Sequence, residues 1–469
     1  MEQRLSAIGR KLTATGQDHV LGWWGRLDGG QRERLLTQLE GLDWKAVAHF
    51  RELVGAGSRR AARPEEVEVP EVVGAGQDDA RRQEARLAGE GLLKAGQVAV
   101  VTAAGGQGTR LGFCGPKGTF AISPVKNKSI FQLHAEKIRA LAARSGRPLP
   151  WYIMTSDTND EATREYFRVN HYLGLRAQDI QFFRQGMAPA MDAKGQLVMD
   201  RPWHVFEAPN GHGGTFDALM NSGMIDDMES RGIEEVFYFQ VDNVLIRIAD
   251  PIFMGLHRLA RAQMSSKVCP KRDPEEKVGV TVLINGRVHV IEYSDLPDEL
   301  CCARNAQGQL KFDAGNIAIH AFRVDFVREL ADEGLEIPWH VAHKKVTCLD
   351  QTDEPVEPTR PNAYKFEHFI FDALPMAARV VLMEVDRRDE FAPVKQQTGE
   401  DSVVTAVEAM MEQWARWLTA VDVRVPRDDR GRPAYPLEIS PLVALEEQDL
   451  FGKVGSDTVI EGPFYLGPA

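Results

Sequence analysis

The sequence predicts an α/β protein whose central domain holds a mostly parallel mixed sheet, with a helical region before it and a small domain after it. Apolar residues recur at helical spacing early in the chain. Between about residues 94 and 390, short apolar runs alternate with helical patterns, which is typical of βα units. That alternation ends near residue 391. We therefore expect a helical region over 1–93, the central domain over 94–390 and a small α+β domain over 391–469.

The N-terminal region is predicted to be helical because its apolar residues are three or four positions apart. They are Leu35, Leu36, Leu39, Leu42, Trp44, Val47 and Phe50. The stretch from Gly55 to Gly76 interrupts this pattern with Pro64, Pro70 and several charged residues. Proline breaks the hydrogen-bond ladder of a helix, and like charges prefer water. We therefore expect an exposed crossing between helices in this stretch.

The central region contains apolar runs that suit strands covered on both faces of a parallel sheet. They are VAVVTAA (98–104), PWYIMTS (150–156) and EVFYFQVDN (235–243), and the helical patterns between them include FQLHAEKIRALAAR (131–144) and EATREYFRVN (161–170). Ligands bind such sheets beyond the carboxyl ends of the strands. A glycine-rich stretch follows residue 103, and Asp242 ends the run at 235–243. Both are therefore candidates for a binding site.

Two further segments have their own patterns. The stretch VGVTVLINGRVHVIEYSDL (278–296) places Asn285-Gly286 between alternating apolar runs, which predicts a β-hairpin and therefore an antiparallel insertion or sheet edge. A helical pattern runs from Val403 to Leu418, and proline-rich and β-type segments follow it. This change of pattern is the reason for expecting a separate C-terminal domain.

Composition excludes several classes of protein. The 469 residues are 43% hydrophobic and 26% charged, which is ordinary for a folded protein, and the net charge of −12 opposes nonspecific binding to nucleic acid. The five cysteines form no CxxC pair and are odd in number, so neither a zinc framework nor a disulfide scaffold is indicated. The N-terminal residues lack the basic-then-apolar pattern that predicts a signal peptide, and no apolar run approaches the roughly 20 residues that cross a bilayer. We expect a cytoplasmic protein without membrane or nucleic-acid partners; its oligomeric state is left open.

The glycine-rich stretch AAGGQGTRLGFCGPKG (103–118) has the composition of a phosphate-binding loop, and two common devices fit it poorly. A P-loop needs GxxxxGK[ST], whereas Lys117 follows Pro116. A dinucleotide-binding fingerprint needs glycine or alanine where this chain has Leu111. A nicotinamide-dependent dehydrogenase also needs an acidic residue about 20 positions later at a strand end. Glu136 lies instead inside a predicted helix.

A longer loop accounts better for these residues. Its amides would wrap a triphosphate, while Arg110 and Lys117 would neutralise the charge that grows on departing pyrophosphate. The same residues could also form a plain glycine-rich turn with two surface cations. The loop alone leaves both interpretations open.

The loop and a series of later motifs resemble the eukaryotic-type UDP-sugar pyrophosphorylases, above all the UDP-N-acetylglucosamine pyrophosphorylase branch. The matches occur in order over roughly residues 95 to 445, and the first 90 residues match less clearly. After AAGGQGTRLGxxxPKG they are PWYIMTS (150–156), FFRQGMAPA (182–190), APNGHGG (208–214), FQVDN (239–243), VGV (278–280), VIEYSDL (290–296), DAGNIAIHAF (313–322), HVAHKKV (340–346), KFEHFIFD (365–372), EFAPVK (390–395) and LEISPLV (437–443).

This resemblance implies a GT-A/Rossmann-like nucleotidyltransferase core and a reversible reaction in which UTP and a sugar 1-phosphate give a UDP-sugar and pyrophosphate. The sugar phosphate would be N-acetylglucosamine 1-phosphate, or glucose or galactose 1-phosphate, and the cofactor would be Mg²⁺. The alternative is a catalytically silent pyrophosphorylase-like protein that binds UDP-sugars or has a regulatory role, since such a protein could keep every motif of the fold.

The resemblance also assigns residues to roles. It implies nucleotide contacts for Ala104, Gly105, Gly106, Gln107, Gln185, Gly211, Asp242 and Lys365. It implies catalytic contacts with the phosphates for Arg110, Lys117 and Lys395, and contacts with the sugar for His212, Gly213, Glu292 and Asn316. Asp242 would also bind the metal, and Gly214 would belong to the second glycine loop.

One position departs from the pattern. The second glycine loop of the N-acetylglucosamine branch reads GNGG, and His212 stands at the place of its Asn. Related glucose-type enzymes carry GHG. Most motifs thus favour an N-acetylhexosamine, whereas His212 favours glucose or galactose, so the identity of the sugar stays open.

Overall fold

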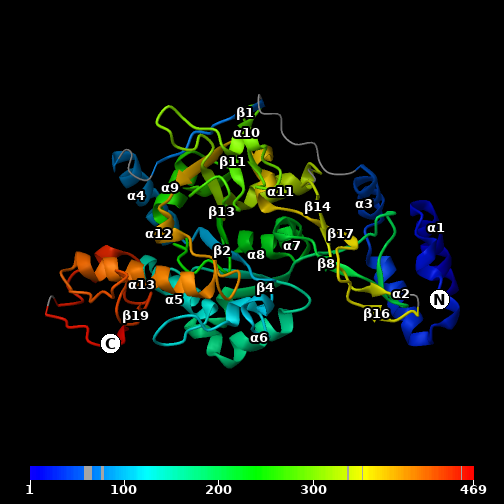
Figure 1. The fold of residues 1–469 in the computed structure, drawn as a ribbon, viewed down its shortest axis with the longest axis horizontal. Coiled ribbons are helices and arrows are strands. Elements are labelled where there is room, and N and C mark those ends of the chain that lie inside the picture. The colour runs from blue at the N-terminus through cyan, green and yellow to red at the C-terminus, as the bar shows by residue number, and fades with distance from the viewer. Residues whose placement is uncertain (57–65, 75–78, 335–336, 351, 456, 469) are drawn as a thin grey trace. The chain divides into compact units, whose positions relative to one another are not determined.

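The computed structural model describes residues 1–56, 66–74, 79–334, 337–350, 352–455 and 457–468 (Figure 1). The chain forms two compact units. The first unit comprises Met1–Ala61, Gln185–Gly214 and Ile337–Ile370, and the second comprises Ala62–Arg184, Thr215–Glu336 and Phe371–Ala469. The expected domain boundaries at residues 93 and 390 stay predictions, because compactness alone does not show which segments fold independently.

In the first unit, the described residues form three N-terminal α-helices and four small antiparallel strand pairs. The helices are α1 (Glu2–Thr15), α2 (Gly29–Gly41) and α3 (Trp44–Ala56). The pairs are β5 (Met187–Pro189) with β8 (Glu207–Pro209), β6 (Met199–Arg201) with β7 (His204–Val205), β14 (His340–Lys344) with β17 (Ala363–Glu367), and β15 (Cys348–Leu349) with β16 (Pro355–Val356). One hydrophobic core joins the helices to these strands.

The N-terminal helices confirm the predicted helical spacing. Leu35, Leu36 and Leu39 on α2 are fully buried. Asp28 begins that helix with a capping box, in which its carboxylate accepts from the Gln31 amide at 2.8 Å and its own amide donates to the Gln31 side chain at 3.0 Å. Residues 57–65 and 75–76, half of the crossing expected between Gly55 and Gly76, lie outside the described residues.

The second unit is built on a ten-stranded mixed sheet. The strands are β1 (Val67–Glu68), β2 (Val98–Ala103), β3 (Trp151–Thr155), β4 (Ile180–Arg184), β9 (Glu235–Gln240), β10 (Met264–Pro270), β11 (Val280–Ile284), β12 (Arg287–Ile291), β13 (Ala314–Arg323) and β18 (Val380–Glu384). The main path is β1-β11-β13-β9-β2-β3-β4, with β10 on β13, β18 on β10 and β12 on β11. The strands β9, β2, β3 and β4 are parallel, whereas β13 runs antiparallel to β9.

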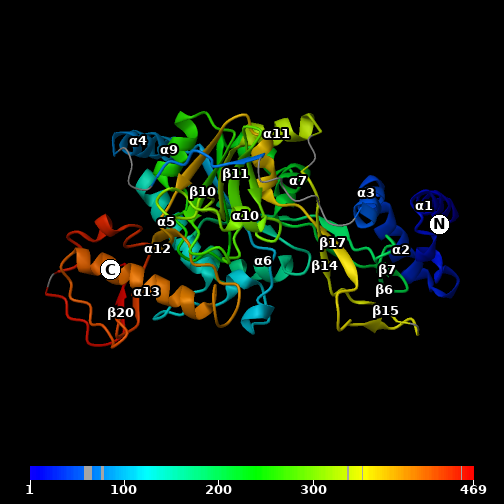
Figure 2. The same cartoon turned by 45° about the horizontal axis from the view of Figure 1, so that its top comes forward.

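Helices cover both faces of this sheet. The helices are α4 (Asp79–Ala95), α5 (Ile130–Ser145), α6 (Asp160–Val169), α7 (Thr215–Asn221), α8 (Met224–Ser230), α9 (Pro251–Leu259), α10 (Asp298–Cys301), α11 (Val324–Asp332) and α12 (Arg387–Glu390). Val98 and Val100 of β2 share a core with α4, α5 and α9, and α4 and α9 lie side by side (Figure 2). On the other face, the Tyr152 hydroxyl donates to Asp227 of α8. None of the helices in the described ranges is both long and apolar enough to span a membrane.

The predicted hairpin is present and lies at the far side of the sheet. Val280 of β11 pairs with Ile291 of β12, and Asn285 and Gly286 turn the chain with φ of 51° and 72°. Positive φ at both central positions is what a tight hairpin turn requires. Val67 and Glu68 pair with β11, so the region expected to be helical also contributes a strand.

The C-terminal part contains the predicted helix as α13 (Val403–Ala420), followed by β19 (Leu437–Ile439) and β20 (Phe464–Leu466), which pair in parallel. Met410, Trp414 and Ile439 belong to the same hydrophobic core as β2 and α5. Within the second unit, this part therefore packs directly on the sheet and its helices.

Candidate active site

Three parallel strands end at one edge of the sheet in the second unit. Val100 of β2 is level with Trp151 of β3 on one side and with Phe237 of β9 on the other. The residues after these strands therefore meet at the carboxyl edge, where α/β proteins bind ligands. They are the glycine-rich loop, the segment from Ser156 and the segment with Asp242.

Main-chain hydrogen bonds close the glycine-rich loop on itself. The Lys117 amide donates to the Gly106 carbonyl at 3.0 Å, and the Gly108 amide donates to the Gly115 carbonyl at 2.8 Å. Among the described residues only two 3-10 turns, Thr109–Leu111 and Lys117–Thr119, occur between these glycines and α5, which begins at Ile130. A P-loop or a dinucleotide-binding loop opens directly into a helix, so the structure supports the longer loop that the spacing favoured.

Polar side chains after β3 orient the main chain of this loop. The side-chain amide of Asn159 donates to the Ala104 carbonyl at 2.8 Å, and the Ser156 hydroxyl donates to the Gly105 carbonyl at 2.8 Å. In a trans peptide the N–H points opposite to the carbonyl. The amides of Gly105 and Gly106 therefore point away from these side chains, and within the described ranges they donate to no acceptor. Two such adjacent amides are available to an anion.

Asn159 and Ser156 were missed in the sequence analysis. Gln107 is held in the same way, because its side-chain amide donates to the Thr158 carbonyl at 2.9 Å. The sequence feature that could have identified Asn159 and Ser156 is the polar run SDTND at 156–160, which lies directly after a buried strand and before a helix.

Lys117 and Asp242 form an ion pair beneath the loop. The Lys117 amine lies 3.1 Å from the Asp242 carboxylate, and the two side chains are 10% and 11% exposed. Lys117 follows the glycines of the loop, whereas Asp242 lies two residues beyond the end of β9. The structure thus brings together a cation and a carboxylate that are 125 residues apart in sequence, and their phosphate and metal roles stay predictions.

A third segment, which leads to Lys395, is fastened beside Asp242. The Val394 amide donates to the Asp242 carbonyl at 3.0 Å. The Asn243 side chain donates to the Glu390 carbonyl at 2.7 Å and accepts from the Ala392 amide at 3.0 Å. Asn243 thus holds the segment 390–392 through its side chain, and it is a third residue that the sequence analysis missed.

A buried charge cluster anchors the same segment from below. The Lys267 amine lies 2.7 Å from the Glu390 carboxylate and 2.9 Å from the Asp250 carboxylate, and all three side chains are buried. Although burial favours the neutral acid, Lys267 and Arg247 hold the pKa of Asp250 well below its usual range. Burial raises the pKa of Glu390 despite the neighbouring amine. Such a cluster stabilises the fold only while every partner is present.

The predicted cations Lys395 and Arg110 differ in their surroundings. The Lys395 amine lies 3.0 Å from the Asp401 carboxylate, with the two side chains 40% and 30% exposed. The Lys395 amide also donates to the Asp401 carbonyl at 2.7 Å. Arg110 is exposed on the loop, and the part of the chain that the structure describes offers it no hydrogen bond or ion pair.

Glu292 and Asn316 meet around Gly279. The Asn316 amide donates to the Gly279 carbonyl at 2.8 Å, and a β-carbon on Gly279 would come within 3.2 Å of the Glu292 carboxylate. On β13, His320 lies opposite Tyr238 of the antiparallel strand β9. Asn316 therefore lies toward the end of β9 after which Asp242 follows, and the sugar contacts of Asn316 and Glu292 stay predictions.

In the first unit, the second glycine loop packs against its own chain. Gly211 has φ of 83°, and a β-carbon there would lie 2.4 Å from the His368 carbonyl. The Gly213 amide donates to that carbonyl at 2.8 Å, and a β-carbon on Gly213 would have equally little space. These glycines are needed for a close approach to residues 368–369, so their predicted contacts with nucleotide and sugar stay predictions.

His212 lies in the same loop with its ring stacked on Phe369 at 5.3 Å between centroids. Its Nδ1 accepts from the Ile370 amide at 3.3 Å. An accepting Nδ1 carries no proton in the neutral ring, so the hydrogen is on Nε2. In this tautomer His212 presents a donor, as the Asn of the related motif can.

Two other predicted contacts lie in the first unit. Gln185 is half-buried and immediately follows β4. Lys365 lies on β17 with its amine over the Phe206 ring at 5.1 Å, and burial lowers its pKa. These contacts do not test whether Gln185 and Lys365 bind the nucleotide, so both roles stay predictions.

Glu136 has a structural role that removes the dehydrogenase interpretation. Its carboxylate accepts from Lys128 at 2.8 Å and from the Ser440 hydroxyl at 2.7 Å, and it is buried within α5. An acidic residue that binds a ribose must reach the ligand from a strand end. Glu136 instead ties α5 to the C-terminal part.

Comparison with known proteins decides the family. A family described as UTP–glucose-1-phosphate uridylyltransferase matches residues 49–420, well over half of the chain. The chain belongs to this family. It is 35% identical over 471 residues to human UDP-N-acetylhexosamine pyrophosphorylase-like protein 1, which covers 94% of this chain and 93% of that protein. It is 39% identical over 343 residues to UDP-N-acetylglucosamine pyrophosphorylase of Saccharomyces cerevisiae, which covers 71% and 72%.

A solved structure supports the fold. The uridine diphosphate N-acetylglucosamine pyrophosphorylase of Trypanosoma brucei is similar with a TM-score of 0.81 and 28% identity, over 96% of this chain and 94% of that one. The predicted family, the α/β nucleotidyltransferase fold and the enzyme class are therefore confirmed.

Proposed function

We propose that this family member transfers a uridylyl group from UTP to a sugar 1-phosphate, releasing pyrophosphate and a UDP-sugar. The observation that carries this proposal is the Lys117–Asp242 pair at the carboxyl edge, beneath two unsatisfied amides of the glycine-rich loop. Adjacent free amides and a buried cation are suited to a polyphosphate. Family membership supplies the reaction class.

The proposed chemistry needs no general base. The attacking oxygen belongs to the phosphate of the sugar 1-phosphate, which is already anionic, and pyrophosphate leaves from the α-phosphorus in line. The protein then has to align the phosphates and neutralise the charge that develops on the leaving group. Arg110, Lys117 and Lys395 are the cations of the second unit with this role, and Lys365 has the corresponding predicted role in the first unit.

Mg²⁺ is the proposed cofactor, and the residues at the edge fit it. The described residues contain no group of three or more His, Cys, Asp or Glu side chains that could hold a metal ion without substrate. Mg²⁺ is usually held by one or two carboxylates together with substrate phosphates and water. Asp242 supplies such a carboxylate. When bound, the ion would neutralise phosphate charge, while Lys117 keeps the Asp242 side chain in place.

We propose N-acetylglucosamine 1-phosphate as the preferred sugar phosphate. Two kinds of support favour it: most sequence motifs follow that branch, and the relatives named above carry N-acetylhexosamine names. His212 is the specific observation that favours glucose or galactose 1-phosphate instead. A catalytically silent protein is not favoured, since this chain retains Arg110, Lys117, Asp242 and Lys395.

The experiment that tests the proposal is a pyrophosphate-release screen. The full chain is incubated with UTP and Mg²⁺ and one of four sugar 1-phosphates: N-acetylglucosamine, N-acetylgalactosamine, glucose or galactose. We expect rapid release with N-acetylglucosamine 1-phosphate and slower release with the others. Asp242→Asn is the matched inactive control. Absence of release with all four sugars would favour the silent protein.

A further inference from the structure

The helix α5 presents two polar side chains to the segment that follows β9. His134 is fully buried and Lys137 is half-buried. They lie three positions apart and therefore project from the same side of the helix. A polar group in a buried place costs free energy unless it forms hydrogen bonds. The partners of these two side chains therefore indicate what the side chains do.

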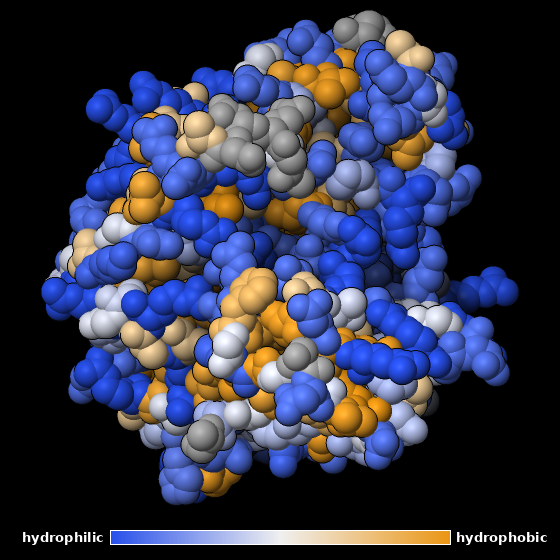
Figure 3. Space-filling view, turned by 90° about the vertical axis from the view of Figure 1, so that its left-hand side faces the viewer, coloured by the Kyte–Doolittle hydropathy of each residue, from blue (hydrophilic) through white to orange (hydrophobic). Residues whose placement is uncertain are grey.

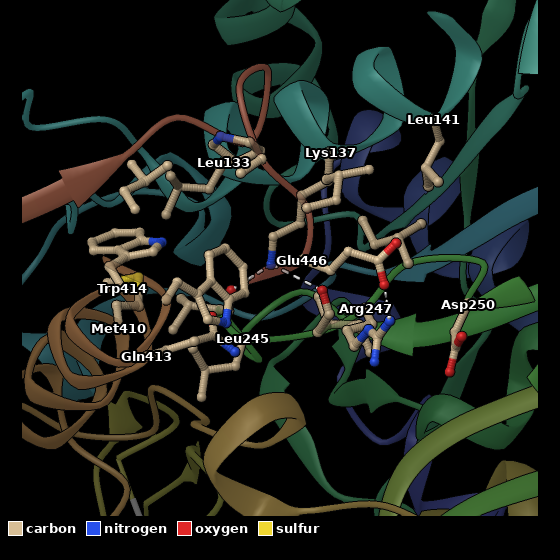
Figure 4. Close-up of a pocket in the computed structure, with 18 of the residues that line it drawn as sticks. Leu133, Lys137, Leu141, Leu245, Arg247, Asp250, Met410, Gln413, Trp414 and Glu446 are labelled. Carbon is tan, nitrogen blue, oxygen red and sulfur yellow. Dashed lines mark hydrogen bonds and ion pairs between the residues drawn. The ribbon is translucent and has the colours of Figure 1, made fainter. Parts of the chain in front are cut away.

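Both side chains bind main-chain carbonyls of that segment. The His134 Nε2 donates to the Val241 carbonyl at 2.9 Å. The Lys137 amine donates to the Val244 carbonyl at 2.7 Å and to the Ile246 carbonyl at 2.9 Å, as the dashed lines in Figure 4 show. The chain has left the sheet here and forms no helix, so its buried carbonyls need partners from elsewhere. The helix α5 supplies three of these hydrogen bonds.

Asp242 lies between these contacts. The carbonyls that α5 binds belong to the residue before Asp242 and to the second and fourth residues after it. The carbonyl of Asp242 itself accepts from the Val394 amide at 3.0 Å. The main chain at Asp242 is therefore held by α5 and by the segment 390–394, while its carboxylate lies 3.1 Å from the Lys117 amine.

The same side of α5 also supports the chain at Lys117. Gly118 packs on the Phe131 ring so closely that a β-carbon on Gly118 would lie 2.3 Å from it. Phe131 lies three positions before His134. Three equally spaced residues of one helix thus contact the chain beside Lys117 and on both sides of Asp242. One rigid element sets the distance between the amine and the carboxylate.

The surroundings of Lys137 leave a small free space. Met410 and Trp414 of α13 line, together with Lys137, a cavity of about 70 Å³ (Figure 4). Figure 3 shows the face on which α13 and the C-terminal part lie, and hydrophobic side chains gather in its lower half. The cavity is too small for a substrate. It does have room for a guanidinium group, which has two more heavy atoms than the end of a lysine side chain.

Taking the proposed function as given, we propose that His134 and Lys137 are positioning residues for Asp242. By holding the main chain before and after Asp242, they keep its carboxylate at the carboxyl edge beside Lys117. There it can bind Mg²⁺ together with the phosphates of UTP. A displacement of about 1 Å at a catalytic site can cost about 100-fold in rate.

Binding of UTP with and without Mg²⁺ tests this role without turnover, because no sugar 1-phosphate is added. Isothermal titration calorimetry of the full chain gives the Kd of UTP in Mg²⁺ and in EDTA. The ratio of the two values is the metal gain. Lys137→Met keeps the length of the side chain and removes its donors. We expect this variant to lose about tenfold of the metal gain, while its Kd in EDTA stays close to that of wild type.

Matched variants separate positioning from a general loss of structure. Lys137→Arg keeps donors for both carbonyls and should restore the metal gain. If Lys137→Met does not fold, His134→Phe takes its place, because it keeps a ring and removes the donor to Val241. It should lose part of the metal gain, whereas His134→Gln, which keeps a donor, should keep most of it. Lys94→Met, which removes an exposed lysine of α4, is the surface control.

Steady-state kinetics give a second readout in an active protein. Lys137→Met should lower kcat by about 10- to 100-fold. Its KM for the sugar 1-phosphate should change little, because the predicted sugar contacts Glu292 and Asn316 lie on other segments. Lys137→Arg should recover most of the lost kcat.

Equal metal gains in wild type and in a folded Lys137→Met or His134→Phe would overturn the proposal. So would a loss in Lys137→Arg as large as in Lys137→Met, at the melting temperature of wild type. Absence of a metal gain in wild type would overturn it whether or not pyrophosphate is released. Loss of the gain in Lys137→Met, in a protein that releases no pyrophosphate, would support the positioning role and contradict uridylyl transfer.

Discussion

The Lys117 amine lies 3.1 Å from the Asp242 carboxylate, and both side chains are almost buried where β2 and β9 end. Two charges so placed depend on each other, because either one alone is left buried without a counter-charge. The pair also connects the two predicted roles at this edge, a cation for phosphate and a carboxylate for metal.

Lys117→Met should therefore affect both stability and turnover. We expect the free energy of unfolding to fall by roughly 3 kcal/mol, because Asp242 loses its counter-ion. Mg²⁺ should restore part of this loss if it binds Asp242. Chemical denaturation with and without Mg²⁺ measures both effects, with Lys94→Met as the surface control. Identical Mg²⁺ responses in the two variants would contradict Asp242 as a metal ligand.

Lys395→Ala should separate catalysis from stability. Its pair with Asp401 is partly exposed, and exposed ion pairs contribute about 0–1 kcal/mol, so the melting temperature should change little. Loss of a charge-assisted contact in the transition state should lower turnover by roughly 10²- to 10³-fold. Steady-state kinetics with saturating UTP and sugar 1-phosphate measure this. A near-normal kcat would remove Lys395 from the mechanism.

His212→Asn should shift the choice of sugar. The change restores the amide of the related motif, and one hydrogen bond that differs by about 1.4 kcal/mol changes a preference tenfold. We expect the ratio of kcat/KM for N-acetylglucosamine 1-phosphate over glucose 1-phosphate to rise by about that factor. His343→Asn, in β14 of the same unit, is the control. An unchanged ratio would place the sugar specificity elsewhere.

His134 should make the protein less stable in mild acid. Its Nε2 donates to the Val241 carbonyl at 2.9 Å, and burial lowers its pKa from 6.5 to about 3. Between these values the unfolded chain binds a proton that the folded protein does not, so stability falls as pH falls, by roughly 1.4 kcal/mol per pH unit.

Denaturation at pH 7 and pH 5 should thus show a loss of about 2 kcal/mol from this residue. His134→Gln keeps a donor for Val241 and cannot gain the proton, so its loss should be smaller by that amount. If the free energy of unfolding fell equally in wild type and His134→Gln, protonation of His134 would not destabilise the folded protein, and this prediction would be wrong.

Local patterns predicted the parallel strands and the edge at which they end. The runs 98–104 and 235–243 are apolar because both faces of these strands are covered, and a glycine-rich loop and Asp242 follow them. The hairpin at Asn285-Gly286 was equally readable, since its turn needs two residues with positive φ.

Contacts between distant segments could not be predicted in this way. Asn243 and Glu390 are 147 residues apart in sequence. Neither spacing nor composition indicates that the Asn243 side chain donates a hydrogen bond to the main-chain carbonyl of Glu390. The first compact unit is assembled from three separate stretches, so no single change of pattern marks its limits. The close approach of Gly211 to His368 is hidden for the same reason.

Single-turnover transfer of isotope tests the central proposal most directly. The protein is mixed with Mg²⁺, N-acetylglucosamine 1-phosphate and UTP labelled with ³²P at either the α or the γ position, and the products are separated. We expect the α label in the UDP-sugar and the γ label in pyrophosphate. Appearance of the γ label on the sugar, or recovery of both labels in unchanged UTP, would contradict uridylyl transfer.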